Sequence, residues 1–94
     1  MSLAFSARVR PSPDVLISQI QGESVLLDVR SEKYFGLDDV GTRMWELLTA
    51  GGTVRQAYEA LLAEYAVQPD QLQNDLEQLI EKLRSVGLIQ VSDA

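Results

Sequence analysis

Alternation of apolar and polar positions predicts strands in the first third of the chain. Residues 15–20, VLISQI, and residues 24–29, SVLLDV, are short runs rich in β-branched side chains. In the second run Val25, Leu27 and Val29 share one face, while Leu26 and Asp28 share the other. The polar sequences QGE and RSEK separate this run from its neighbours and favour turns. With KYFGL at residues 33–37, the pattern predicts a three-stranded antiparallel meander.

A helical spacing of apolar residues begins where this third strand ends. The first helix is expected to start at Asp38 or Asp39, either of which can cap it, and to end at the glycines of TAGG. Thr53 is the predicted cap of a second helix over residues 54–65. A third helix is expected from about Pro69 to Val86, with these apolar positions: Leu72, Leu76, Leu79, Ile80, Leu83 and Val86. Residues 88–91, LIQV, either add a last short strand or pack against the core.

Three strands followed by three helices predict an α+β fold that resembles a winged helix-turn-helix. A chain of 94 residues, 46% of them hydrophobic, fits one domain with one core. We expect this domain to span residues 14–91. Residues 1–13 contain two arginines, small residues and PSP, and are expected to form a flexible N-terminal segment.

Composition and charge exclude several classes of function. The chain has no cysteine and no histidine, which removes the commonest metal ligands and the commonest general base, and we expect no cofactor. The net charge is -6, and residues 59–81 contain six acidic residues and no lysine or arginine. Phosphate groups would be repelled, so DNA binding through the third helix and attachment to anionic membranes are disfavoured. With no signal peptide or apolar span, a cytoplasmic protein is expected.

No set of residues indicates catalysis. Asp38 and Asp39 are adjacent at a helix start, where carboxylates usually serve as caps. The tyrosines fit a core with a hydrated hydroxyl group, and TAGGT lacks the lysine of a phosphate-binding loop. The sequence therefore predicts a protein that is not an enzyme.

A binding module is the class that remains. The strand KYFGL ends the meander, so its outer edge offers unpaired backbone groups to which an extended peptide can add. Residues 33–37 would supply the edge, and the third helix would supply the opposite wall through Leu72, Asp75, Leu76 and Leu79. At least half of these leucines are expected to pack in the core instead. The same edge can also pair with a second copy, which would give a homodimer.

The ordered landmarks from residue 25 to residue 89 resemble the PqqD-like proteins. These landmarks are VLLD, the aromatic pair YF, LD-x-VG-x-x-x-W-x-LL, T-V at the second helix, and an acidic third helix ending in GLI. That family comprises non-catalytic recognition elements for ribosomally synthesised, modified peptides. The resemblance implies that the leader of a precursor peptide adds beside the third strand and packs against the third helix. It thus places the binding site at these residues: Lys33, Tyr34, Phe35, Gly36, Leu37, Leu72, Asp75, Leu76 and Leu79.

The hairpin sequence bears on the pathway. The pyrroloquinoline quinone member has a glycine-methionine hairpin and an asparagine before its first helix. RSEKYFGLDDVG is more similar to the stand-alone proteins of lasso-peptide clusters, which work with a separate leader peptidase. The quinone-type peptide chaperone remains the alternative, as does a transcription-associated winged helix acting through protein contacts. Relatives often have glycine where Glu32 or Lys33 lies, so the geometry of this turn is left open.

Overall fold

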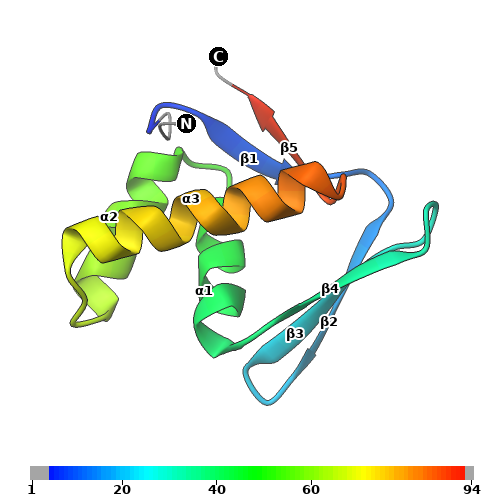
Figure 1. Cartoon of the computed structure of the whole chain (residues 1–94), viewed down its shortest axis with the longest axis horizontal. Helices are drawn as coiled ribbons and strands as arrows, with labels where there is room; N and C mark the ends of the chain where they lie inside the picture. Colours follow the sequence, from blue (N-terminus) through cyan, green and yellow to red (C-terminus); the bar gives the residue numbers. More distant parts are fainter. Residues whose placement is uncertain (1–4, 93–94) are drawn as a thin grey trace.

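The computed structural model describes residues 5–92, which form five strands and three helices. In chain order these are β1 (Arg8–Pro11), β2 (Val15–Ile20), β3 (Glu23–Asp28), β4 (Lys33–Leu37), α1 (Asp39–Leu48), α2 (Val54–Glu64), α3 (Pro69–Ser85) and β5 (Ile89–Ser92). The helices lie between two separate sheets, with β1 and β5 at one end of the molecule and β2, β3 and β4 at the other (Figure 1).

The larger sheet is the predicted meander, in the order β2-β3-β4 with both pairs antiparallel. A two-residue turn joins β2 to β3, and both of its residues are left-handed, Gln21 at φ 54° and Gly22 at φ 87°. This conformation matches the twist of the flanking strands. In the longer turn before β4, Glu32 has φ 62°, so this glutamate adopts a conformation that glycine takes without strain. The turn geometry that the sequence left open therefore has its left-handed residue at Glu32.

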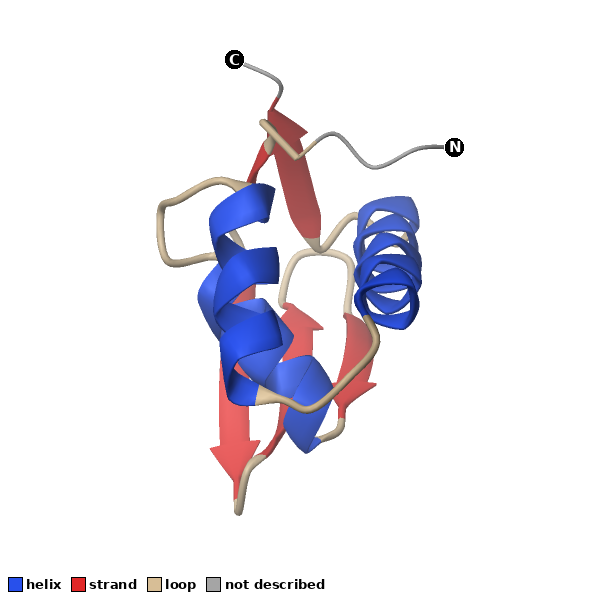
Figure 2. Cartoon of the chain, turned by 90° about the vertical axis from the view of Figure 1, so that its left-hand side faces the viewer, coloured by secondary structure: helices blue, strands red, loops and turns tan. Residues whose placement is uncertain are grey.

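The smaller sheet corrects the prediction for the N-terminal segment. Arg8–Pro11 pairs antiparallel with Ile89–Ser92, and Ala7 and Val9 are buried in the core. The two strands lie side by side beyond the helices in both views (Figures 1 and 2). The N-terminal chain also approaches α2, because the Val54 N–H donates to the Ala7 carbonyl at 2.8 Å. The flexible segment predicted for residues 1–13 is therefore wrong for Arg8–Pro11, and residues 1–4 of that prediction lie outside the described residues.

Each helix begins at the residue type that the sequence favours. The Asp38 carboxylate accepts a hydrogen bond from the Gly41 N–H at 2.7 Å. Thr53 and Gln56 form a reciprocal capping box at the start of α2, and Pro69 occupies the first turn of α3. The predicted caps of α1 and α2 are confirmed, and α3 ends one residue earlier than expected, at Ser85.

The core lies among the three helices, the inner face of the larger sheet and the smaller sheet. Its largest fully buried side chains are Leu26, Leu48, Val54, Leu61, Leu76, Leu83 and Leu88. Leu26 is 0% exposed, whereas its strand neighbours Val25 and Leu27 remain exposed at 45% and 38%. The face predicted for Val25, Leu27 and Val29 is therefore the outer face of the sheet, and Leu26 points inward.

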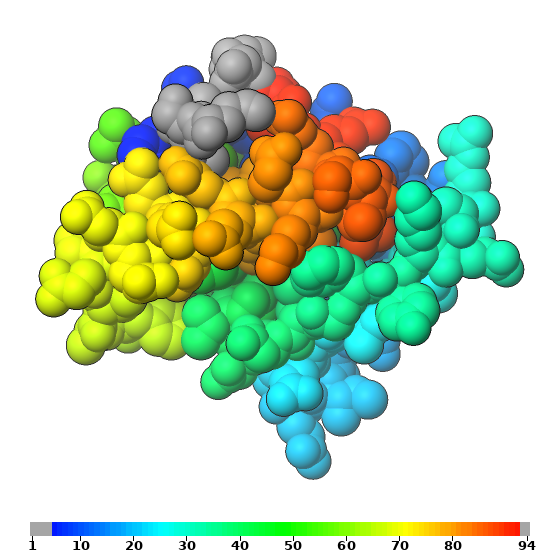
Figure 3. All heavy atoms as spheres, in the orientation of Figure 1, coloured from blue at the N-terminus to red at the C-terminus, as the bar shows by residue number. Residues whose placement is uncertain are grey.

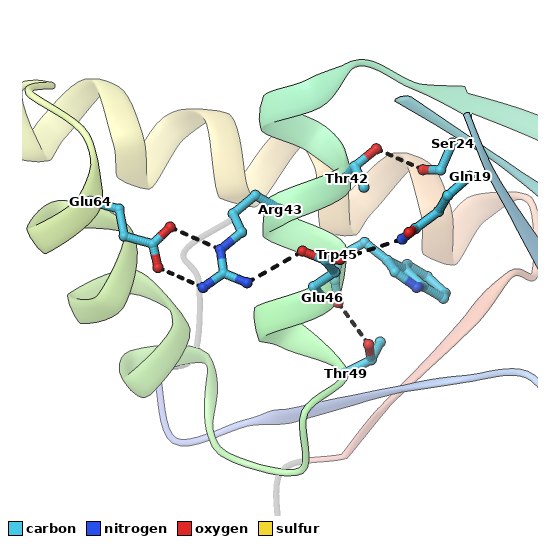
Figure 4. A network of polar contacts seen from close by, with 8 residues as sticks. All are labelled: Gln19, Ser24, Thr42, Arg43, Trp45, Glu46, Thr49 and Glu64. Atoms are coloured by element: carbon cyan, nitrogen blue, oxygen red, sulfur yellow. Dashed lines mark hydrogen bonds and ion pairs between the residues drawn. The ribbon is translucent and has the colours of Figure 1, made fainter. Parts of the chain in front are cut away.

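A buried hydrogen bond joins the sheet to α1. The hydroxyl groups of Ser24 in β3 and Thr42 in α1 lie 2.7 Å apart, and both residues are at most 5% exposed (Figure 4). Nearby, Arg43 donates to Glu64 and Glu46 and so ties α1 to the end of α2. The Ser24–Thr42 pair satisfies two polar groups that water cannot reach, so we expect it to fix the position of α1 on the sheet.

Replacement of Thr42 by valine is expected to lower the free energy of unfolding by about 1–3 kcal/mol, because the Ser24 hydroxyl loses its partner. The double variant Ser24→Ala/Thr42→Val removes both polar groups and should recover part of that loss. Urea unfolding of the four proteins of this cycle measures the coupling. Additive losses would show that the hydrogen bond does not couple the two elements.

Candidate functional site

An open groove lies between the edge strand β4 and helix α3. Its volume is about 370 Å³, and its lining residues are Phe35, Gly36, Leu37, Asp38, Gly41, Asp75, Gln78, Leu79 and Lys82. The space-filling view shows α3, in yellow and orange, across this face, with the green and teal surface of α1 and β4 directly beside it (Figure 3). The floor is apolar, and the rim from α3 is polar and charged.

The structure brings together five of the nine predicted site residues. Phe35, Gly36, Leu37, Asp75 and Leu79 line the groove. Leu37 is also 6% exposed and so anchors the end of β4 in the core, whereas Phe35 and Leu79 are half-buried.

The other four predicted residues do not line the groove. Leu72 and Leu76 are buried in the core beneath α3, which confirms that at least half of the candidate leucines serve packing. Tyr34 is 75% exposed on the outer face of the sheet, opposite Leu27, and Lys33 is exposed at the start of β4. Both residues belong to the edge strand, but the Tyr34 side chain points away from the groove and Lys33 lies beyond it.

Four groove residues were not predicted from the sequence. Gln78 and Lys82 follow Asp75 by three and seven positions, so helical periodicity places them on the same face. Asp38 and Gly41 come from the first turn of α1, which closes one end of the groove. A Cβ atom on Gly41 would lie 3.1 Å from the Asp38 carboxylate and 3.3 Å from Leu37, so glycine permits this close approach.

The backbone of β4 is open on the side that faces the groove. Within the described residues β4 pairs only with β3, so alternate N–H and C=O groups of residues 33–37 point away from the sheet. A chain that paired here would send every second side chain toward Phe35, Leu37 and Leu79. The arrangement can therefore hold an extended peptide through backbone hydrogen bonds to β4 and through the apolar floor of the groove.

The rim of the groove carries charges of both signs. Asp75 accepts a hydrogen bond from the Gln71 amide at 2.8 Å, and Lys82 lies on the same face of α3. Because both are at the rim, the groove offers a partner separate acidic and basic contacts.

The turn before β4 is held by the Asp28 carboxylate. It accepts hydrogen bonds from the backbone N–H groups of Arg30 and Ser31, and the first of these lowers the pKa of Asp28 below its usual value. Hydrogen bonding from Arg43 likewise lowers the pKa of Glu64. Both carboxylates stabilise the fold when ionised, so these contributions are present at neutral pH and are lost as the pH falls through the lowered pKa values.

Residues 5–92 contain no group of three or more acidic side chains placed to hold a metal ion. No helix in that range is both long enough and apolar enough to cross a bilayer.

Two solved structures share this fold over most of the chain. The structure of TbiB1 in complex with the TbiA(beta) leader peptide is 34% identical, with a TM-score of 0.80, over 86% of this chain and 94% of that one. Lasso peptide synthetase B1 complexed with the leader peptide is 26% identical, with a TM-score of 0.79, over 88% of this chain and 98% of that one. No protein of curated function matches the sequence.

The family model described as coenzyme PQQ synthesis protein D, PqqD, matches residues 23–89. This range includes β3, β4, all three helices and the whole groove. The expected resemblance is confirmed both by this match and by the shared fold. The chain belongs to the PqqD family.

Proposed function

We propose that this protein binds the leader segment of a ribosomally made precursor peptide as an added strand on β4. The observation that carries the proposal is the open edge of β4 beside an apolar groove walled by α3. Both similar structures are complexes with a leader peptide, which supports the same class of ligand here. In this mode the backbone contributes affinity, and the groove selects the side chains that enter it.

The bound leader would be presented to a separate processing enzyme in the cytoplasm, and the protein itself would be non-catalytic. Among the peptide pathways, the lasso pathway is favoured because one of the two similar structures is a lasso peptide synthetase B1. The enzyme would then be a leader peptidase. A role in quinone synthesis, as a chaperone for a radical enzyme, is the second candidate, and the family match favours it.

Fluorescence polarisation tests this function directly. A labelled leader from the precursor peptide of the same gene cluster is titrated with the full chain, and short duplex DNA is added as the competitor. The expected result is saturable leader binding that DNA does not displace, since the chain carries a net charge of -6. Absence of leader binding, together with DNA binding at low salt, would instead support a nucleic-acid-binding winged helix.

Charge reversal at Asp75 is expected to weaken leader binding if a cationic side chain of the leader lies at this rim. An exposed pair at about 4 Å is worth on the order of 1–4 kcal/mol, so Asp75→Lys should lower affinity by about tenfold at low salt. The loss should shrink near 1 M salt, where charges are screened within about 3 Å.

Glu81→Lys is the matched control, because it makes the same charge change on α3 outside the groove. It should leave affinity within about twofold, the range of weak surface charge effects. Equal affinity of Asp75→Lys and the unmodified protein at low salt would show that Asp75 meets no cation of the leader.

A further inference from the structure

The two ends of the groove between β4 and α3 carry opposite charges. Asp75 and Lys82 both line it from α3 and are seven positions apart, which is about two helical turns or about 10 Å along the helix axis. Residues seven positions apart lie on the same face of a helix, so the carboxylate and the ammonium group both border the groove. Asp38, the N-cap of α1, also lines the groove and adds a second carboxylate.

The direction of α3 decides which charge lies at which end of the groove. The last turns of α3 lie toward the hairpin from which β4 starts, and its first turns lie toward α2 (Figure 1). In the space-filling view the orange surface of these last turns lies against the teal surface of β4 (Figure 3). Lys82 therefore belongs to the end where β4 begins with Lys33. Asp75 belongs to the end where β4 leads through Asp38 into α1.

Both charged groups on α3 are available to a ligand. No ion pair within residues 5–92 involves Lys82 or Asp75. Lys82 is exposed, and the hydrogen bond that Asp75 accepts comes from the Gln71 amide, which is neutral. Asp75 is also half-buried, so a cationic partner would gain more there than at a fully exposed carboxylate.

An apolar stretch separates the two charged ends. Leu79 lies between Asp75 and Lys82 in α3, and Phe35 and Leu37 line the same groove from β4. In an added strand, the side chains that enter the groove are two residues or about 6.6 Å apart, so the first and third of them are about 13 Å apart. Long charged side chains at these two positions can reach the two charges on α3, while the side chain between them lies over Leu79.

We propose that the groove selects leader peptides by the order of their charges. The class of leader that it takes has an acidic side chain at the Lys82 end, an apolar side chain over Leu79, and a lysine or arginine at the Asp75 end. These side chains occupy alternate positions of the added strand, so the two charged residues are four positions apart. The inference rests on the proposed function and names the peptide class for that site. Reversal of the strand would place like charges together at both ends, so the same residues also fix its direction.

The competing ligand class is a uniformly basic leader. The net charge of -6 would by itself attract such a peptide. A uniformly basic strand, however, would place a cation beside Lys82, where like charges repel. The effect of Lys82 on affinity therefore distinguishes a leader with ordered charges from a basic one.

The test combines protein variants with a charge scan of the leader. Fluorescence polarisation follows binding of the labelled leader from the same gene cluster to the full chain, and each charged residue of the leader is reversed singly. Lys82→Glu reverses the charge at one end of the groove. Arg84→Glu makes the same change on α3 outside the groove and is the matched control. Circular dichroism checks the fold, and Lys82→Gln replaces Lys82→Glu if the latter does not fold.

The expected result is a loss of leader affinity of about tenfold for Lys82→Glu at low salt, with a change within about twofold for Arg84→Glu. One leader variant, in which a single acidic residue is reversed to lysine, should restore most of the affinity of Lys82→Glu. Asp75→Lys should likewise be rescued by reversal of one cationic residue, four positions from the first. Both losses should shrink near 1 M salt.

Unchanged affinity of Lys82→Glu or of Asp75→Lys would overturn the inference. Equal rescue by every reversed leader residue would also overturn it, because that result indicates only long-range attraction. So would two rescuing residues an odd number of positions apart, since they would lie on opposite faces of the strand. Tighter binding by Lys82→Glu would identify a uniformly basic leader instead. Failure of the unmodified protein to bind the leader would contradict the proposed function.

Discussion

Proline at one of two neighbouring positions of β4 is expected to weaken leader binding strongly while leaving the protein folded. Adjacent strand residues direct their N–H groups to opposite edges, so Tyr34→Pro and Phe35→Pro remove one donor toward β3 and one toward the open edge. The variant that loses the outward donor should stay folded by circular dichroism. Its affinity for the leader, measured in the polarisation titration, should fall at least about tenfold. A carbonyl group of the bound leader would lose its N–H donor, and a buried carbonyl without a partner costs about 1–3 kcal/mol.

Two alanine variants, Tyr34→Ala and Phe35→Ala, separate the effect of losing a side chain from the effect of losing a backbone N–H donor. Tyr34→Ala should bind the leader nearly as well as the unmodified protein, because Tyr34 lies on the outer face, whereas Phe35→Ala should weaken binding through the groove. A proline variant that remains folded and binds the leader with unchanged affinity would rule out strand addition on β4. The edge of β2 would then be the next site to examine.

The larger sheet and the helices were predictable because their signals are local. The QGE turn, the Asp38 and Thr53 caps and the 3.6-residue spacing in α3 are each contained in a few consecutive residues. The confirmed elements follow from these signals. These local signals do not show which face of the sheet is buried, because period-two alternation divides a strand into two faces without distinguishing them.

Strand β1 illustrates what local pattern cannot provide. Its four residues, RVRP, include two arginines and a proline, and only Val9 points into the core. Its partner β5 lies about eighty positions away, and the pairing Val9 with Val91 depends on the helices having placed both ends of the chain together. Proline is tolerated here because β1 has only one partner strand.

The site was predictable at the level of elements and less so at the level of side chains. Edge position and an apolar helix face identified β4 and α3, and five predicted residues do line the groove. Leu72 and Leu76 share the helical stripe with Leu79, yet they lie deeper, because burial depends on how α3 is rotated against the rest of the core. Rotation of a helix is a tertiary property, so the stripe alone could not separate groove residues from core residues.

That separation leads to the second large expected effect, a contrast between two leucines three residues apart on α3. Leu76 is 0% exposed, so Leu76→Ala should leave a cavity and lower the free energy of unfolding by about 2–5 kcal/mol. For a domain with about 5–15 kcal/mol of total stability, that is a large share, and the midpoint of thermal unfolding should fall by about 4–8 °C per kcal/mol. Urea unfolding gives the same quantity at constant temperature.

Leu79→Ala removes the same atoms from a half-buried position in the groove, so its stability loss should be smaller and its leader affinity should fall. Leu76→Ala should bind the leader normally under conditions in which it remains folded, because its side chain does not line the groove. Leu76→Ala should therefore lower stability without lowering leader affinity, whereas Leu79→Ala should lower leader affinity with a smaller loss of stability. If Leu79→Ala instead destabilised the fold as much as Leu76→Ala and left leader affinity unchanged, Leu79 would be a core residue and the leader would have to bind outside the groove.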